Sequence, residues 1–278
     1  MFNSSITRRS VLNYFSKKLI PLESILPAMI FLIICFNGCD NPDEPQTMFK
    51  AEERVTGQFE FHSQVNKISI TNPIGFTYLY GVVDTLKTRY VIDRSVWAKS
   101  YQAAESEMKK ISVENSVSGD SGMYKVVYPS NTENIYGCNL NLEINKRVIE
   151  LTSPNKGIQT DFLNADISAE TGSYNAILDH HSGSINVKTI SGKITSTAAL
   201  PYEGFCICYS ESGDINIKIP KGTSATVVLK TNNGSVSIKN LDLTILTNTN
   251  TEITGTLNDA TGVIYLESKT GNVTLEGI

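Results

Sequence analysis

The sequence lacks an apolar run long enough to favour a transmembrane helix. Its apolar run at residues 25–36 has 12 residues, whereas a membrane-spanning helix needs about 20. The run follows a basic N-terminal region that includes Arg8 and Lys17, which is the order of features in a secretory signal peptide. We therefore expect residues 1–38 to be a signal peptide and not part of the fold.

An excess of basic residues is also missing. The chain has 24 Lys and Arg against 28 Asp and Glu, with a formal net charge of −4. Removal of the basic signal peptide would make the remainder more negative. Because surfaces that bind nucleic acid are basic, this balance argues against a nucleic-acid partner.

The familiar motifs of catalysis are absent as well. The sequence has no calcium-binding nonapeptide, phosphate loop or nucleophile elbow, and the acids near its repeats, Glu211 and Asp214, are isolated. The densest group of reactive side chains is Asp179-His180-His181. We expect it to be a solvated turn, with a surface metal or acid–base role as the alternative. The sequence therefore predicts no catalytic residue, no cofactor, no metal and no enzyme.

A short motif at the end of the signal peptide predicts a lipid anchor. Phe36-Asn37-Gly38-Cys39 resembles the bacterial lipobox, in which a small residue precedes a cysteine that is lipidated and becomes N-terminal. Phe36 departs from the usual Leu. We expect lipidation at Cys39, with ordinary cleavage or an uncleaved anchor as the alternatives.

The residues after Cys39 predict a flexible tether. Residues 40–45 are acidic and contain two prolines, a composition typical of disorder, and we place the tether at residues 39–56. Such an acidic run resembles a surface-export signal of Bacteroidetes lipoproteins, whereas Asp40 resembles an inner-membrane retention signal of enteric bacteria. We expect a lipid-anchored protein of the bacterial cell envelope, at the outer membrane or cell surface rather than the inner membrane.

The other cysteines predict neither a disulfide framework nor a metal site. Cys206 and Cys208 occupy positions that other repeats fill with Ile, Val or Leu, so we expect them to act as small buried hydrophobes. Two cysteines at i and i+2 on one strand are poorly placed to bond each other. Cys138 could reach one of them only from a neighbouring coil, so the sequence leaves their oxidation state open.

A repeated phrase dominates residues 165–275. Two apolar residues at alternating positions precede a Gly, and two more follow it, as Val227, Leu229, Val236 and Ile238 do around Gly234. Alternation with period two indicates strands with one buried face, and we expect the intervening Gly to turn the chain with a positive φ. The phrase recurs every 21 residues at Gly192, Gly213, Gly234 and Gly255. This spacing predicts one domain at residues 57–278, an all-β, parallel β-helix-like solenoid of stacked coils of about 20 residues.

Two segments depart from the repeat. Residues 95–110 contain good helix formers after a candidate N-cap, Ser95, and predict one short helix covering an end of the stack. In residues 241–250, polar Asn248 and Asn250 occupy apolar positions. The strand register between residues 241 and 255 is therefore open, and we expect a bulge or loop there.

The C-terminus suggests self-association. Residues 271–278 end the chain in phase with the repeat and leave no cap. Because the last coil of a solenoid must cover its unpaired backbone, we expect the C-terminal coil to pair with a second copy or with another envelope protein.

Several phrases together resemble a known family. They are Ile68 to Gly75, the helix near residues 97–110, the strand at residues 111–113, and the Ser-Gly-Ser/Asp-Ile phrases at Ser182 and Ser212. They resemble the bacterial "putative adhesin" β-strand-repeat family, a group of domains of unknown function often found as lipoproteins. The resemblance implies a solenoid at the cell envelope and no catalytic residues.

Three functions remain open from the sequence. The first is a non-enzymatic, adhesin-like structural or interaction module anchored to the envelope, with a protein or glycan ligand. The frequent tyrosines of the first half, which include Tyr78 and Tyr80, suit a glycan-binding face as well as ordinary strands. The alternatives are an envelope-stress sensor that acts with a membrane partner and, less favoured, a carbohydrate-active β-helix enzyme.

Overall fold

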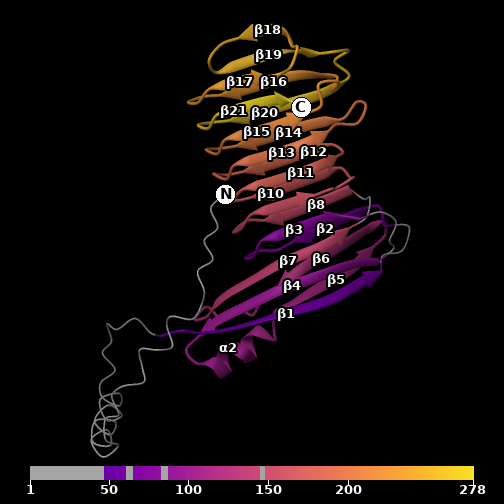
Figure 1. Ribbon diagram of the computed structural model, residues 1–278. Coiled ribbons are helices and arrows are strands. Elements are labelled where there is room, and N and C mark those ends of the chain that lie inside the picture. Colours follow the sequence, from indigo (N-terminus) through magenta and orange to yellow (C-terminus); the bar gives the residue numbers. More distant parts are fainter. Residues whose placement is uncertain (1–46, 61–64, 83–86, 145–147) are drawn as a thin grey trace, which may run out of the picture. The chain divides into compact units, whose positions relative to one another are not determined.

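The computed structural model describes residues 47–60, 65–82, 87–144 and 148–278. The predicted signal peptide, Cys39 and most of the predicted tether lie outside these residues. Thr47–Ile278 forms one compact unit, and in its described part it consists of two β-sheets and one short helix, α2 (Tyr101–Met108). The predicted all-β solenoid is confirmed (Figure 1).

The first sheet, called sheet A, has ten strands in the described part of the chain. In spatial order they are β1 (Phe49–Glu60), β4 (Lys87–Ala98), β7 (Ile135–Ile144), β3 (Thr77–Gly81), β9 (Ile158–Asp161), β11 (Ala176–Ser182), β13 (Ile194–Ala199), β15 (Ile215–Ile219), β21 (Val273–Gly277) and β17 (Val236–Lys239).

The second sheet, called sheet B, has eleven described strands. In spatial order they are β18 (Thr244–Asn248), β19 (Glu252–Leu257), β16 (Ala225–Thr231), β20 (Gly262–Ser268), β14 (Phe205–Ser210), β12 (Ile185–Thr189), β10 (Ile167–Thr171), β8 (Val148–Ser153), β2 (Lys67–Thr71), β6 (Ser121–Val127) and β5 (Ser112–Ser118).

Each coil of the stack gives one strand to each sheet. In the coil of β12 and β13, alternate residues point inward, so that Ile185, Val187 and Ile194 are buried while Asn186 between them is exposed. Parallel pairing in register stacks equivalent positions, such as Ile167, Ile185 and Cys206. The core is therefore a column of aliphatic side chains between the sheets, as the alternation predicts.

The glycines of the repeat are required by close packing of backbones, and the expected positive φ is wrong for most of them. Among the described glycines only Gly119 and Gly183 have positive φ. A Cβ on Gly213 would overlap the carbonyl oxygen of Gly192, and a Cβ on Gly271 would overlap that of Gly213. Each coil thus lies against the bare Cα of the next, where no side chain fits.

The stacking order differs from the sequence order at two places. The final coil, β20 and β21, lies between the coil of β14 and β15 and the coil of β16 and β17, as the yellow strands in Figure 1 show. The early coil of β2 and β3 likewise lies between β6 and β7 on one side and β8 and β9 on the other. Gly255 lies inside β19, so the fourth glycine of the 21-residue series is not at a coil corner.

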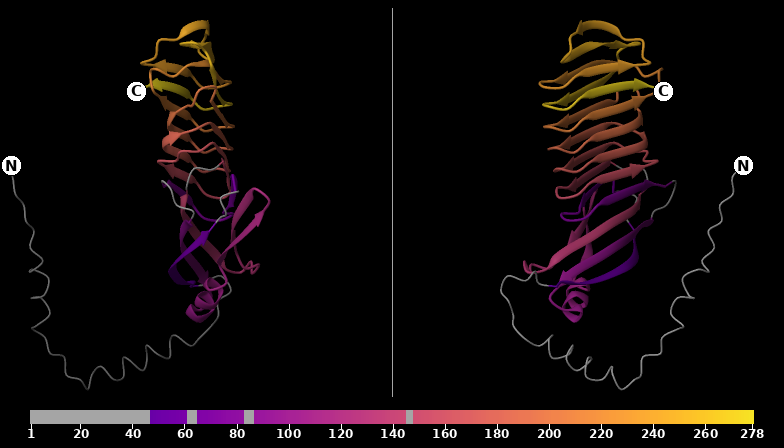
Figure 2. Two further views of the ribbon diagram at one scale, coloured as in Figure 1. Left: turned by 90° about the vertical axis from the view of Figure 1, so that its right-hand side faces the viewer. Right: turned by 60° about the vertical axis from the view of Figure 1, so that its left-hand side comes forward.

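The position of the final coil contradicts the predicted self-association through the C-terminus. Strand β21 is paired on both sides, with β15 and with β17, and β20 is paired with β14 and β16. No edge of the last coil is left for a second copy, because the chain folds back and inserts it. At that end of the stack the outermost strands are β17 in sheet A and β18 in sheet B (Figure 2).

The hairpin of β18 and β19 confirms the expected irregularity between residues 241 and 255. Both strands run antiparallel to their neighbours, and the register shifts between Ile245 and Thr247, as a bulge does. This hairpin covers the edge of β16 that a continued parallel repeat would leave open.

At the other end the predicted boundaries need two corrections. The tether was expected to reach residue 56, but β1 begins at Phe49 and pairs antiparallel with β4. Strand β1 was not predicted because its exposed, charged residues have the composition of a tether. In the fold these charges form ion pairs, such as that of Arg54 with Asp93 at 2.6 Å. The helix was expected over residues 95–110, but β4 continues to Ala98. Ser100 is the N-cap of α2, and its Oγ accepts a hydrogen bond from the Ala103 N–H.

Replacement of Gly213 by Ala tests the packing requirement. Because the added Cβ would overlap the Gly192 carbonyl oxygen, we expect Gly213→Ala to lower the free energy of unfolding by several kcal/mol, on the order of the larger point-mutation effects. Gly222→Ala is the control, since a Cβ there meets nothing within 4 Å, and it should change stability by less than about 1 kcal/mol. Chemical denaturation of residues 47–278 measures both, and equal losses would contradict the close stacking.

Candidate functional site

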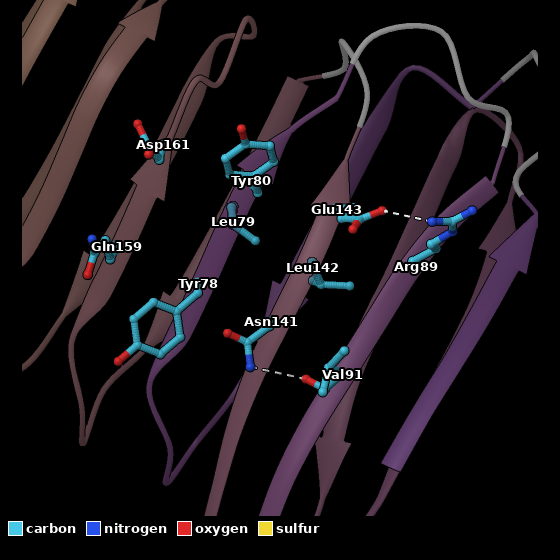
Figure 3. Close-up of a pocket in the computed structure, with 10 residues that line it drawn as sticks. All are labelled: Tyr78, Leu79, Tyr80, Arg89, Val91, Asn141, Leu142, Glu143, Gln159 and Asp161. Atoms are coloured by element: carbon cyan, nitrogen blue, oxygen red, sulfur yellow. Dashed lines mark hydrogen bonds and ion pairs between the residues drawn. The ribbon is translucent and has the colours of Figure 1, made fainter. Parts of the chain in front are cut away.

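The most distinctive surface feature is a groove on the outer face of sheet A. It has a volume of about 360 Å³ and lies over β3, β4, β7 and β9. Ten residues line it: Tyr78, Leu79, Tyr80, Arg89, Val91, Asn141, Leu142, Glu143, Gln159 and Asp161 (Figure 3). Its size falls in the range of small-molecule sites, roughly 300–1,000 Å³.

The strand register arranges these side chains in two rows across the strands. The first row is Val91, Asn141, Tyr78 and Gln159, one residue from each of four neighbouring strands. Neighbours in such a row are about 4.8 Å apart along the hydrogen-bonding direction. The Asn141 Nδ2 donates to the Val91 carbonyl oxygen at 3.4 Å. Tyr78 therefore stands between two carboxamide side chains.

The second row carries the charges. Arg89, Glu143, Tyr80 and Asp161 are in register on the same four strands. Arg89 Nη1 lies 3.9 Å from Glu143 Oε2. Figure 3 shows this ion pair on one side of Tyr80 and Asp161 on the other. The phenol of Tyr80, whose residue is 49% exposed, is thus flanked by a carboxylate on each side.

An aromatic pair extends the second row beyond β9. Phe162 and His180 stack with ring centroids 4.5 Å apart and planes 5° apart, and Phe162 meets the edge of Tyr80 with centroids 5.9 Å apart. The His180 Nδ1 lies 2.9 Å from Asp161 Oδ1. The row therefore continues as three rings with one carboxylate held beside them.

Both stacked residues have unfavourable backbone conformations. Phe162 has φ 53° and His180 has φ 48°, in the left-handed region that costs L-residues on the order of 1–2 kcal/mol. For a bulky aromatic residue this is an outlier. Such strain concentrates at functional sites and persists where the surrounding structure fixes it. Phe162 lies in a bend after β9 and His180 lies within β11, and both rings are exposed, Phe162 by 52%.

A second aromatic group lies at the opposite end of the groove. Phe76 contacts Tyr78 and Tyr174, each with ring centroids 6.2 Å apart. The Lys156 ammonium lies 4.9 Å from the Tyr174 ring centroid and 5.8 Å from that of Phe76. Aromatic side chains therefore border the groove on two sides, next to Tyr78 and next to Tyr80.

Sequence reasoning found this site only in part. Tyr78 and Tyr80 were named among tyrosines suited to a glycan-binding face, and they line the groove. Other tyrosines of the same half lie elsewhere, since Tyr124 is buried in the core and Tyr128 donates to Asn72 Oδ1 at 2.8 Å. Arg89, Asn141, Glu143, Gln159 and Asp161 were missed. They come from strands up to 72 residues apart, and no local pattern connects them.

The histidines of Asp179-His180-His181 are separated by the fold. His180 is exposed and belongs to the stacked pair, but His181, expected to be solvated, is 2% exposed. Neither His181 ring nitrogen has a hydrogen-bond partner among the described residues. Burial lowers the pKa of His181 to about 4, against smaller opposing effects of the Ser184 backbone and of the nearby Asp166. The reason is that the register of β11 shifts between Leu178 and His181, which turns the second histidine inward.

The buried His181 predicts a loss of stability in mild acid. Its pKa is about 4 when folded and about 6.5 when unfolded, so the unfolded chain binds the extra proton between these values. The free energy of unfolding is therefore not reduced by His181 above pH 7, and it falls by about 3 kcal/mol as the pH drops to 4. Urea denaturation at pH 7 and pH 4.5 measures this. His181→Leu should remove most of the difference and His180→Asn should keep it, and a profile unchanged in His181→Leu would contradict the assignment.

The cysteines of the described region are free thiols. Cys138, Cys206 and Cys208 are all buried, and the Cys206 and Cys208 sulfurs lie 3.9 Å apart. Burial raises the pKa of Cys138 to about 12, and the contact with Cys206 raises the pKa of Cys208. The expected behaviour as small hydrophobes is confirmed for Cys206 and Cys208, which stack on Ile185 and Val187.

The isolated acids near the repeats do not form a site. Asp214 accepts a backbone hydrogen bond from Asn272 at 2.8 Å, and Glu211 pairs with Lys269 at 3.2 Å, so both stabilise coil corners. In residues 47–60, 65–82, 87–144 and 148–278, no three His, Cys, Asp or Glu side chains gather as a metal would require. No helix within these ranges has the length and apolar character of a membrane span.

Comparison with known protein families agrees with the fold. Residues 141–276 match the family model described as Toastrack DUF4097. A structure described as a "putative cell adhesion protein" from Clostridium sporogenes shares 12% identity and a TM-score of 0.49, over 82% of this chain and all of that one.

Two structures described as "putative adhesins" are also similar. The one from Bacteroides fragilis has 9% identity and a TM-score of 0.25, covering 81% of this chain and 97% of the other. The one from Parabacteroides merdae has 12% identity and a TM-score of 0.23, covering 81% and 96%. No curated protein matches the sequence.

Proposed function

Because the chain carries a Toastrack DUF4097 domain over residues 141–276, a domain of unknown function, we propose that it is an adhesin-like interaction module of the bacterial cell envelope. The proposal has two parts, a lipid anchor at Cys39 and a contact site in the groove of sheet A. The observation that carries it is the groove, in which the half-buried Tyr78, the exposed Tyr80, two carboxamides and three charged side chains meet on one face.

The arrangement favours binding over catalysis. Glu143 and Asp161 flank Tyr80 in register, which places their Cα atoms about 9.6 Å apart across two strand spacings. Inverting glycosidases hold their two carboxyl groups roughly 6.5–9.5 Å apart. Here, however, Glu143 faces Arg89 and Asp161 faces the His180 Nδ1. Each carboxylate is thus in contact with a basic side chain, Glu143 with Arg89 and Asp161 with His180. We therefore propose a non-enzymatic role.

The anchor places this surface at the envelope. Lipidation at Cys39 would leave the residues before Thr47 as a short tether, followed by the compact unit Thr47–Ile278. In this proposal residues 1–38 are the signal peptide, and the tether begins at Cys39. Two or three acyl chains anchor a protein stably where a single chain does not.

Replacement of Cys39 tests the anchor. We expect wild-type protein to incorporate a fatty-acid analogue and to fractionate with membranes, because the acyl chains attach at Cys39. Cys39→Ala should lose the label and appear in the soluble fraction. Cys35→Ala is the matched control and should keep both properties. Equal labelling of wild type and Cys39→Ala would reject the anchor.

Adhesion of cells tests the contact site. Cells that express the full chain should adhere to mucin-coated or collagen-coated surfaces more than cells without it. Tyr78→Ala with Tyr80→Ala should reduce the retained cells to the level without the chain, whereas Tyr202→Ala should not. Tyr202 is a suitable control because it is 78% exposed and is not among the residues that line the groove. Retention that is the same for all variants would reject the groove as the contact site.

A further inference from the structure

We infer that the ligand of the sheet A groove is a neutral saccharide, bound by the rings of Tyr78, Tyr80, Phe162 and His180 and by the polar groups between them. This inference rests on the proposed function, since it names the ligand class for the same groove. Four observations carry it: the absence of a free strand edge at the groove, the spacing of the rings, the kind of polar groups, and their charge.

The backbone hydrogen-bonding groups of the strands beneath the groove are already paired with neighbouring strands. Strand β3 is paired with β7 and β9, and β7 is paired with β4 as well. A peptide that adds a strand to a sheet needs an unpaired edge, and none exists beneath this groove. The ligand must therefore be recognised by side chains alone, and it must bring its own apolar faces and hydrogen-bonding groups.

The rings provide surfaces of the right kind. Tyr78 and Tyr80 are two residues apart on β3, so their Cα atoms are separated by about 6.6 Å, and Figure 3 shows both rings on the outer side of the sheet. Phe162 and His180 continue the aromatic surface beyond Tyr80. The C–H faces of pyranose rings pack on exposed aromatic rings, and a series of such rings suits several sugar units in a row.

The polar groups match hydroxyl groups. The carboxamides of Asn141 and Gln159 both donate and accept hydrogen bonds, while the carboxylates of Glu143 and Asp161 accept. They stand on either side of Tyr78 and Tyr80 in the two rows. Sugar hydroxyls also donate and accept, so a sugar stacked on either tyrosine meets a partner on each side.

The charges of the lining residues disfavour an acidic saccharide. The single cation among the groove's lining residues, Arg89, lies opposite Glu143, and Asp161 adds a second carboxylate. An anionic ligand would face a lining with one cation against two carboxylates, since Lys156 lies beside Phe76 and Tyr174 and is not among the lining residues. A neutral saccharide has no such cost, and this selects it over uronic acid polymers and sulfated glycans.

The backbone strain gives a test that separates binding from stability. Phe162 has φ 53°, a conformation that Gly adopts without strain. Phe162→Gly should therefore unfold at a temperature at least as high as wild type while losing a ring of the binding surface. A residue with a purely structural role would not show this combination.

The experiment uses residues 47–278, the compact unit, on an array of neutral and acidic oligosaccharides, followed by calorimetric titration of the tightest ligand. We expect neutral oligosaccharides to bind. Tyr80→Ala and Phe162→Gly should each weaken binding by at least about tenfold, the loss typical of a central aromatic contact. Tyr80→Phe should keep most of the affinity, and Tyr202→Ala should keep all of it.

Each other outcome is informative. Binding of acidic saccharides alone, or binding that the groove variants leave unchanged, overturns the inference. If no saccharide binds but the tyrosine variants abolish cell adhesion, the saccharide is rejected and the proposed function stands. If no saccharide binds and adhesion is also unaffected, both are rejected.

Discussion

Close stacking of backbone on backbone is the constraint on which the rest of this structure depends. A coil of about 20 residues buries too few aliphatic side chains, at about 1.5–3 kcal/mol each, to offset about 1–2 kcal/mol of backbone entropy for every ordered residue. Each coil is therefore stable only against its neighbours, through parallel ladders and a shared aliphatic column. The ladders form only if coils approach to strand spacing. At the corners this approach requires Gly213 and Gly271, where a Cβ would overlap the preceding coil.

The two inserted coils change what such a stack implies about folding. In a simple solenoid each repeat contacts only its neighbours in sequence, and the ends can fray independently. Here the last strands of the chain, β20 and β21, separate coils that are adjacent in sequence. The stack cannot be completed until the C-terminus is in place. The antiparallel strand β19 then covers β16 at that end, and α2 packs against β1 and β4 at the other.

Because the inner faces of both sheets form the core, only side chains on the outer faces can contact a ligand. Pairing in register places the side chains of neighbouring strands side by side, whether the strands are parallel, as β7, β3 and β9 are, or antiparallel, as β4 and β7 are. Residues distant in sequence therefore form continuous rows. The groove combines two such rows across β4, β7, β3 and β9. At its edge the chain departs from regular geometry, where Phe162 and His180 take left-handed conformations and stack on each other. A rigid scaffold carrying a few strained, exposed residues is a common way to build a recognition surface.

The sequence by itself determined the class of fold, because an alternation of period two with recurrent Gly leaves few structures other than stacked strands. It also identified core positions such as Leu229, which is fully buried, and the irregular segment after Leu241. Strand β1 escaped it, because a strand stabilised by charged pairs such as Arg54 and Asp93 has the composition of a tether. The order of the coils escaped it too, since equivalent apolar positions fit every neighbouring coil equally well. Only the tertiary structure decided that the last coil is inserted, that His181 points inward while His180 points outward, and that Tyr80 stands between Glu143 and Asp161. These outcomes depend on register between distant strands, and a periodic sequence carries little information about which of its periods become neighbours.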